Sequence, residues 1–225
     1  MAERRITAMG IVAVALASLL GSGCLVKEIT HTWYLDEDGA VEWVVQEKDV
    51  RSDAKTVEDR RIEEAAYWLS VQQERHPVLQ GFRELGGSNL RIAILRPSVP
   101  YSLQTEARFT GLDLLGQRII ASIGGMGSSM VARDGTTWTW TFTMRDPSGP
   151  GGTGDPTDAI TDLLSNLEDL RIVLVQGFFE SAAGFEISKD GRVARFQTEP
   201  SSGRETEPHS PLFTLKLVWK SAPAQ

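Results

Sequence analysis

The chain has 225 residues, of which 41% are hydrophobic and 24% are charged. These values are near the averages for globular domains, so they exclude disorder as the general state of the chain. The formal net charge is −7, which argues against a nucleic-acid binder, because neutralising phosphates requires a basic surplus.

The first element is a short apolar segment behind two basic residues. Arg4 and Arg5 precede the apolar run 8–20, and Gly21, Ser22 and Gly23 then lead into Cys24. This order is typical of a secretory signal peptide over residues 1–23. The run is shorter than the roughly 20 residues that cross a bilayer, so a permanent transmembrane anchor is the weaker interpretation. Removing the segment leaves 21 basic and 29 acidic side chains and a net charge of −8.

The sequence around the cleavage point, Leu20-Gly21-Ser22-Gly23-Cys24, resembles the lipobox of bacterial lipoproteins. It departs from the family pattern in having Gly21, not leucine, three places before the cysteine. The resemblance implies a lipidated Cys24, with palmitate-type acyl chains that hold an exported domain to a membrane of the cell envelope. Leu25 follows in place of aspartate, which in Gram-negative members of the family implies the outer membrane. The alternative is an ordinary secretory signal followed by an incidental free thiol.

Beyond Cys24 the first half of the chain alternates hairpins and helices. Asp38-Gly39 supplies the tight turn of a hairpin, and Thr56 with Asp59 forms a capping signal ahead of a helix. In that helix Ile62, Ala65, Ala66 and Leu69 recur at helical spacing. The elements expected are a hairpin over 29–45, helices over 53–75 and 77–85 ending at Gly86-Gly87, and strands over 90–94 and 103–109.

The second half again combines helices with hairpins, although no sequence repeat of fixed period is visible. Asp134-Gly135 precedes a strand in which threonines alternate with aromatic residues, and Asp190-Gly191 marks another hairpin. Gly and Pro are dense in a loop at 147–155. The elements expected are helices over 112–123 and from 155 to 170, strands over 137–144, 170–175 and 215–219, and a hairpin over 185–196 after which a polar linker spans 198–210.

Hairpins interspersed with helices predict an α+β fold. We expect one exported domain over 24–225, built as an antiparallel, twisted sheet with about four helices packed on one face. A doubly wound parallel sheet would need a helix after nearly every strand.

Neither a catalytic nor a metal-binding residue can be nominated. His31, His76 and His209 lie far apart, and no Gly-x-Ser-x-Gly elbow or phosphate-binding glycine loop is present. His31 is in phase with apolar neighbours and indicates a hydrogen-bonded histidine on a buried face. His76 is expected at a helix end, where its charge suits the negative pole. Asp36, Glu37 and Asp38 fit a turn better than a calcium loop. No cofactor is expected.

The aromatic strand offers one functional hypothesis. Trp138, Trp140 and Phe142 share a face and could line a cavity for an apolar ligand, although an ordinary core explains the same pattern. We therefore expect a non-enzymatic envelope lipoprotein that binds a partner protein or an apolar ligand near the membrane. A lipid-anchored hydrolase of unrecognised type and a structural envelope component are the alternatives.

Overall fold

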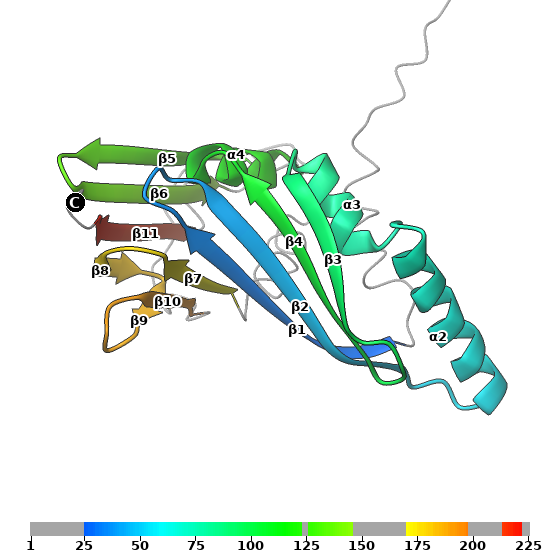
Figure 1. The fold of residues 1–225 in the computed structure, drawn as a ribbon. Coiled ribbons are helices and arrows are strands. Elements are labelled where there is room, and N and C mark those ends of the chain that lie inside the picture. Colours follow the sequence, from blue (N-terminus) through cyan, green and yellow to red (C-terminus); the bar gives the residue numbers. More distant parts are fainter. Residues whose placement is uncertain (1–24, 123–125, 146–169, 198–212, 222–225) are drawn as a thin grey trace, which may run out of the picture.

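The computed structural model describes residues 25–122, 126–145, 170–197 and 213–221 (Figure 1). Cys24, the loop at 147–155, the helix expected from 155 and the linker at 198–210 lie outside the described residues, as does His209.

A seven-stranded sheet has the order β3-β4-β2-β1-β7-β10-β9. Its bounds are β1 Leu25–Leu35, β2 Val41–Ser52, β3 Ser88–Arg96, β4 Tyr101–Phe109, β7 Leu170–Leu174, β9 Phe185–Ile187 and β10 Val193–Phe196. The pairing of β1 with β7 is parallel, and the other pairings are antiparallel. The turn between β1 and β2 closes at Gly39, whose φ of 80° is accessible to glycine without a steric cost.

A four-stranded antiparallel sheet has the order β5-β6-β11-β8. Its bounds are β5 Met126–Asp134, β6 Thr137–Arg145, β8 Phe178–Ala183 and β11 Phe213–Lys220. Strand β8 was missed at the sequence level, because its buried Phe179 is followed by Glu180, Ser181 and two alanines. That segment lacks the regular apolar alternation that identifies a strand.

Three helices lie in the described part of the chain: α2 Val57–Gln72, α3 Pro77–Glu84 and α4 Leu112–Ser122. The Thr56 side chain accepts a hydrogen bond from the Asp59 backbone N–H, so the predicted N-cap of α2 is confirmed. Helix α3 is followed by Gly86 at φ 71°, and the Gly87 N–H bonds to the Phe82 carbonyl, which is the glycine termination expected there.

The main core lies between one face of the seven-stranded sheet and the elements that cover it. Trp33 of β1 meets Trp140 of the four-stranded sheet with ring centroids 6.2 Å apart, and Trp43 of β2 meets Phe82 of α3 at 5.1 Å. Figure 1 shows the long strands β1 to β4 running from the four-stranded sheet to α2. A second, smaller core of Val50, Tyr67, Val71 and Leu103 joins α2 to the far end of these strands.

The prediction of one antiparallel sheet covered by about four helices was wrong. Most of the described structure is β, and a second sheet covers much of the face that was assigned to helices. The physical reason is strand pairing across long sequence separations: β7 adds to the edge of β1, and β11 inserts between β6 and β8. Each local pattern is the same in either arrangement, so it does not indicate which partner a strand will choose.

Candidate functional site

A β-bulge in β2 places a carboxylate inside the protein. Val41, Trp43, Val45 and Glu47 alternate inward, the register then shifts between Glu47 and Val50, and Val50 also faces inward. The shift passes through Asp49, which has a positive φ of 52°. A bulge of this kind re-aims the side chains that follow it. Glu47 therefore lies at the boundary between the main core and the smaller core beside α2.

Three side chains from three different elements surround the Glu47 carboxylate, which is 1% exposed. Lys27 Nζ of β1 lies 2.5 Å from Oε1, and His76 Nε2, just before α3, lies 3.0 Å from Oε2. The Tyr67 hydroxyl of α2 donates to Oε2 at 3.4 Å. The His76 contact has ion-pair distance but not the alignment of a good hydrogen bond. We call these four residues the Glu47 cluster.

The electrostatics of the cluster favour an ionised Glu47. Burial alone would raise the pKa of this carboxyl group, but His76 and then Lys27 outweigh burial and lower the pKa to about 2. Burial, followed by the Glu47 charge, raises the pKa of Tyr67 above its ordinary value. Because His76 is 0% exposed, its imidazole does not face solvent. The cluster therefore ties β1, β2, α2 and α3 together around a buried carboxylate.

The Glu47 cluster was not found from the sequence. His76 was expected at a helix end where its charge suits the negative pole, and instead it is the buried N-cap residue of α3. Glu47 has the spacing of an inward-facing residue in β2, and this was the available signal. Its partners come from positions 27, 67 and 76, and only the tertiary structure brings them together.

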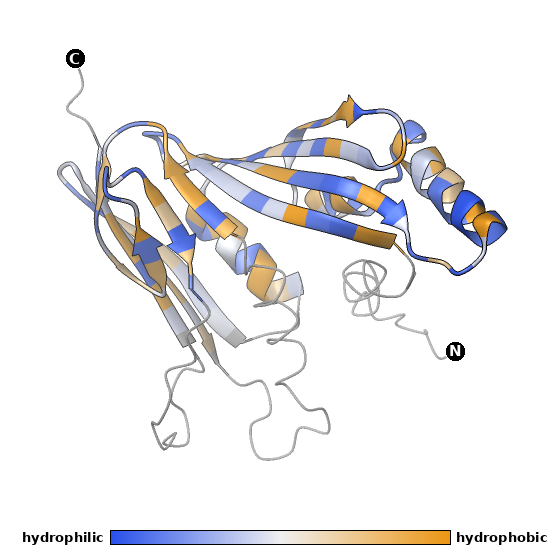
Figure 2. Cartoon of the chain, turned by 90° about the horizontal axis from the view of Figure 1, so that it is seen from below, coloured by the Kyte–Doolittle hydropathy of each residue, from blue (hydrophilic) through white to orange (hydrophobic). Residues whose placement is uncertain are grey.

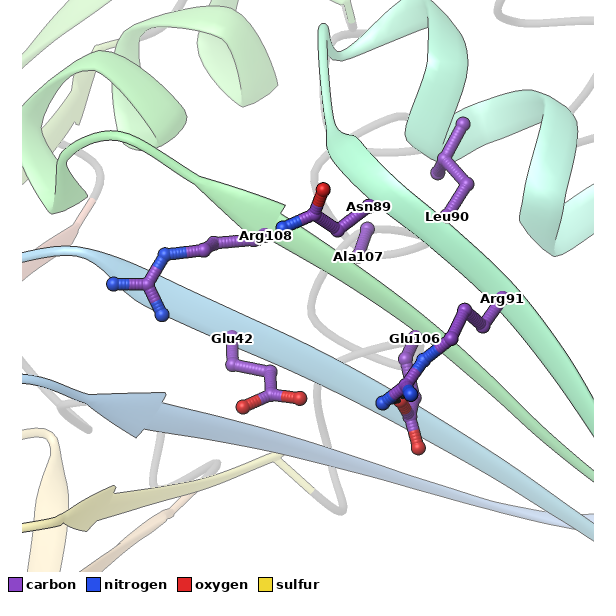
Figure 3. Close-up of a pocket in the computed structure, with 7 residues that line it drawn as sticks. All are labelled: Glu42, Asn89, Leu90, Arg91, Glu106, Ala107 and Arg108. Carbon is purple, nitrogen blue, oxygen red and sulfur yellow. Dashed lines mark hydrogen bonds and ion pairs between the residues drawn. The ribbon is translucent and has the colours of Figure 1, made fainter.

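The opposite face of the seven-stranded sheet carries an open hollow of about 440 Å³. Its lining comes from β2, β3 and β4, and its members are Glu42, Asn89, Leu90, Arg91, Glu106, Ala107 and Arg108. In Figure 3 the charged side chains rise from neighbouring strands on one side of the sheet, and Arg91 lies against Glu106. Outward-facing residues of paired strands form such a row because side chains alternate along a strand.

Ion pairs organise the charges of this hollow. Arg91 Nη2 lies 2.5 Å from Glu106 Oε2, and Arg108 Nη2 lies 2.6 Å from Asp36 Oδ2 at the end of the first hairpin. A hydrogen bond from Gln104, assisted by Arg91, lowers the pKa of Glu106. The surface thus presents carboxylates and guanidinium groups in fixed positions, which suits polar recognition of another molecule.

The aromatic stripe lies in and beside the main core. Trp140 is 1% and Phe142 4% exposed, and Trp140 Nε1 donates to Ser129 Oγ at 2.9 Å. Trp138 is half-buried at the edge, where its ring stacks on Trp219 at 5.9 Å. The contacts of Trp140 and Phe142 favour the packed-core interpretation over a cavity.

His31 and the turn residues Asp36 and Asp38 lie where they were expected. His31 is half-buried and its Nδ1 accepts a hydrogen bond from Trp43 Nε1 at 3.2 Å. Asp36 and Asp38 belong to the hairpin turn, and the Asp38 side chain accepts from the Ala40 N–H. Within the described ranges, histidines, cysteines and carboxylates form no group of three that could hold a metal ion. None of the helices there combines the length and apolarity needed to cross a membrane.

Comparison with known proteins gives one solved structure. No family model matches the chain, and no curated protein matches it. The folded domain of the Mycobacterium tuberculosis LppM protein, solved by NMR, aligns with a TM-score of 0.37 and 10% sequence identity. The alignment covers 89% of this chain and 92% of that one. A likeness at this level does not transfer function, so the function has to be inferred from this chain.

Proposed function

We propose that this protein is a lipid-anchored lipoprotein of the cell envelope that holds a rigid, β-rich domain directly at a membrane and binds a partner protein there. The observation that carries the proposal is the position of Leu25. It is the first residue of β1, and it follows the lipobox-like Cys24 without any linker. Two residues later Lys27 enters the Glu47 cluster, so little chain separates the anchor from buried structure.

The anchor is tested by metabolic labelling with an alkyne analogue of palmitate. The full chain should incorporate the label, and Cys24→Ala should lose it and remain as the uncleaved precursor. Leu25→Ala is the matched control, because it changes the neighbouring residue and keeps the thiol. Label that persists in Cys24→Ala would exclude this anchor.

The protein is more suited to bind a partner protein than an apolar ligand, because its hollow is lined by the charged residues Glu42, Arg91, Glu106 and Arg108. Fixed, partly exposed charges give specificity in protein recognition, whereas an apolar ligand needs an apolar concave site. The apolar stripe around Trp140 is instead filled by its neighbours.

The partner site is tested in cells with a photo-crosslinking residue in place of Asn89, which lines the hollow. A discrete adduct should form there and be lost when Arg91→Glu is added. The matched control places the photo-crosslinker at Met130, an exposed position on the four-stranded sheet. Equal adducts at both positions, or none at Asn89, would count against this face as the binding surface.

A further inference from the structure

Helix α2 is oriented opposite to the usual arrangement of an amphipathic helix. Ile62, Ala65, Ala66 and Leu69 have the spacing that ordinarily marks a buried stripe, yet all four are exposed, with Ile62 at 57% and Leu69 at 50%. We call these four residues the α2 stripe. The inward face of the helix instead combines apolar and polar contacts: Tyr67 and Val71 are buried in the smaller core, and Trp68 packs against it. This face carries Tyr67 of the Glu47 cluster and the carboxylates of Glu63 and Glu64, which accept hydrogen bonds from Ser52.

The apolar packing of Val71 and Trp68 and the polar contacts of the same face together determine this orientation. The Ser52 N–H donates to Glu64 at 3.1 Å and the Ser52 hydroxyl donates to Glu63. Turning the stripe inward would break these bonds and remove Tyr67 from Glu47. The apolar stripe therefore stays outside, and nothing in the described chain covers Ile62 and Leu69.

Other apolar side chains are exposed at the same end of the molecule. Twelve large apolar residues are exposed in the described part of the chain. Seven of them lie on α2, at the start of β1, or at the end of β3 and in the turn that follows it. These seven are Val26, Val57, Ile62, Leu69, Ile94, Leu95 and Val99. Scattered exposed apolar residues are ordinary, whereas a concentration of them at one end indicates a contact surface.

This end is also where the anchor enters. Leu25 pairs with Ser52 and packs against the small core beneath α2, together with Trp68 and Tyr101. The rings of Trp68 and Tyr101 stack at 5.0 Å, which joins α2 to the start of β4. Figure 2 shows the start of β1 at the same end of the long strands as α2.

We propose that the α2 stripe is a membrane-docking surface that lies on the bilayer carrying the acylated Cys24. This proposal rests on the proposed function, because the lipid on Cys24 brings the stripe to the bilayer. Four small or medium side chains offer far less area than the roughly 1,200 Å² of a stable protein interface. They suffice as a second contact once an anchor makes that contact intramolecular.

The surface fits an apolar contact rather than an attraction to anionic lipid. Helix α2 contains four acidic residues, Glu58, Asp59, Glu63 and Glu64, against Arg60 and Arg61. An interfacial helix buries its apolar face about 5–10 Å into the boundary between headgroups and acyl chains. Docking should therefore be at least as strong on phosphatidylcholine as on membranes that contain phosphatidylglycerol, and on phosphatidylcholine it should change little with salt.

The test uses the full, processed lipoprotein in phosphatidylcholine vesicles that contain lipid with a nitroxide near the top of the acyl chain. Acylation consumes the thiol of Cys24, the only cysteine, so a new cysteine can be labelled specifically with a fluorophore. Probes at Ile62→Cys and Leu69→Cys should be quenched several-fold more than probes at the controls. Met130→Cys is the control for an exposed apolar site on the other sheet, and Arg60→Cys is the control for another side of α2.

The outcomes separate this inference from the proposed function. Label on Cys24 with equal quenching at all four probes would overturn the docking surface and leave the anchor intact. Disulfide or cross-linker adducts between two copies through residue 62 would overturn it in favour of a helix-to-helix dimer. Absence of acyl label would remove both proposals, and this is read before any quenching measurement. In a further pair of variants, the probe is at residue 62 with Leu69→Glu, or at residue 69 with Ile62→Glu. Loss of the quenching in both variants supports docking.

Discussion

At the scale of single residues, Glu47 contributes to the stability of the fold through a buried ion pair. Its carboxylate is buried and faces Lys27 and His76. Breaking a buried ion pair by removing one partner leaves uncompensated charge and costs about 3–5 kcal/mol. Glu47→Gln should lower the free energy of unfolding by this amount in urea denaturation at pH 7. Glu28→Gln, an exposed neighbour on β1, should change it by less than about 0.5 kcal/mol.

The same residue predicts how stability varies with pH. The pKa of Glu47 is about 2 in the folded protein and 4.5 when unperturbed, so the unfolded chain binds a proton first as the pH falls. The ionised Glu47 carboxylate therefore adds roughly 3 kcal/mol to the free energy of unfolding. This stabilisation is fully present above pH 4.5 and is lost as the pH falls toward 2. Urea denaturation from pH 7 to pH 2.5 should therefore show a smaller loss of stability in Glu47→Gln than in the wild type. Parallel curves would contradict the assignment.

Trp140 and Trp138 should differ in their effect on stability. Trp140→Ala removes a side chain that is 1% exposed and should cost about 3–5 kcal/mol. Trp138→Ala should cost less, because Trp138 is half-buried at the core edge. Thermal denaturation followed by circular dichroism measures both. Lipid-dependent fluorescence that is lost in Trp140→Phe, together with a small cost for Trp140→Ala, would favour a ligand cavity.

At the scale of elements, two helical glycines predict opposite effects. A Cβ at Gly116 of α4 would lie 2.6 Å from Ser129 Cβ of β5, whereas a Cβ at Gly81 of α3 would meet nothing within 4 Å. Gly116→Ala should therefore push the helix off the sheet and cost about 1–3 kcal/mol. Gly81→Ala should stabilise by about 0.5–1 kcal/mol, because alanine favours a helix. Denaturation midpoints measure both, and the same sign for the two would contradict this packing.

At the scale of the whole molecule, both sheets share the main core, in which Trp33 contacts Trp140. The chain from Leu25 onward should therefore unfold in one cooperative transition. Tryptophan fluorescence and far-ultraviolet circular dichroism should give the same midpoint in urea. Leu217→Ala in β11 should shift both probes equally. Two separate midpoints would show that the sheets are independent units.

The sequence by itself determined the hairpin turns and the start of the first helix. Asp-Gly pairs marked three hairpin turns, where Gly39, Gly135 and Gly191 all have positive φ, and Thr56 marked the start of α2. These features depend on neighbours within a few residues, so their physics is complete in a short window. The lipobox-like segment ending at Cys24 is equally local, and its lipidation remains a prediction.

Only the tertiary structure decided which strands pair and which helix face is buried. The parallel pairing of β1 with β7 joins residues more than 130 positions apart, and no local pattern specifies such a partner. The Glu47 cluster likewise draws on positions 27, 47, 67 and 76. Tyr67 of this cluster and Val71 of the smaller core hold the other face of α2 inward. The α2 stripe, with Ile62 and Leu69, therefore faces outward, against the periodicity of its own sequence.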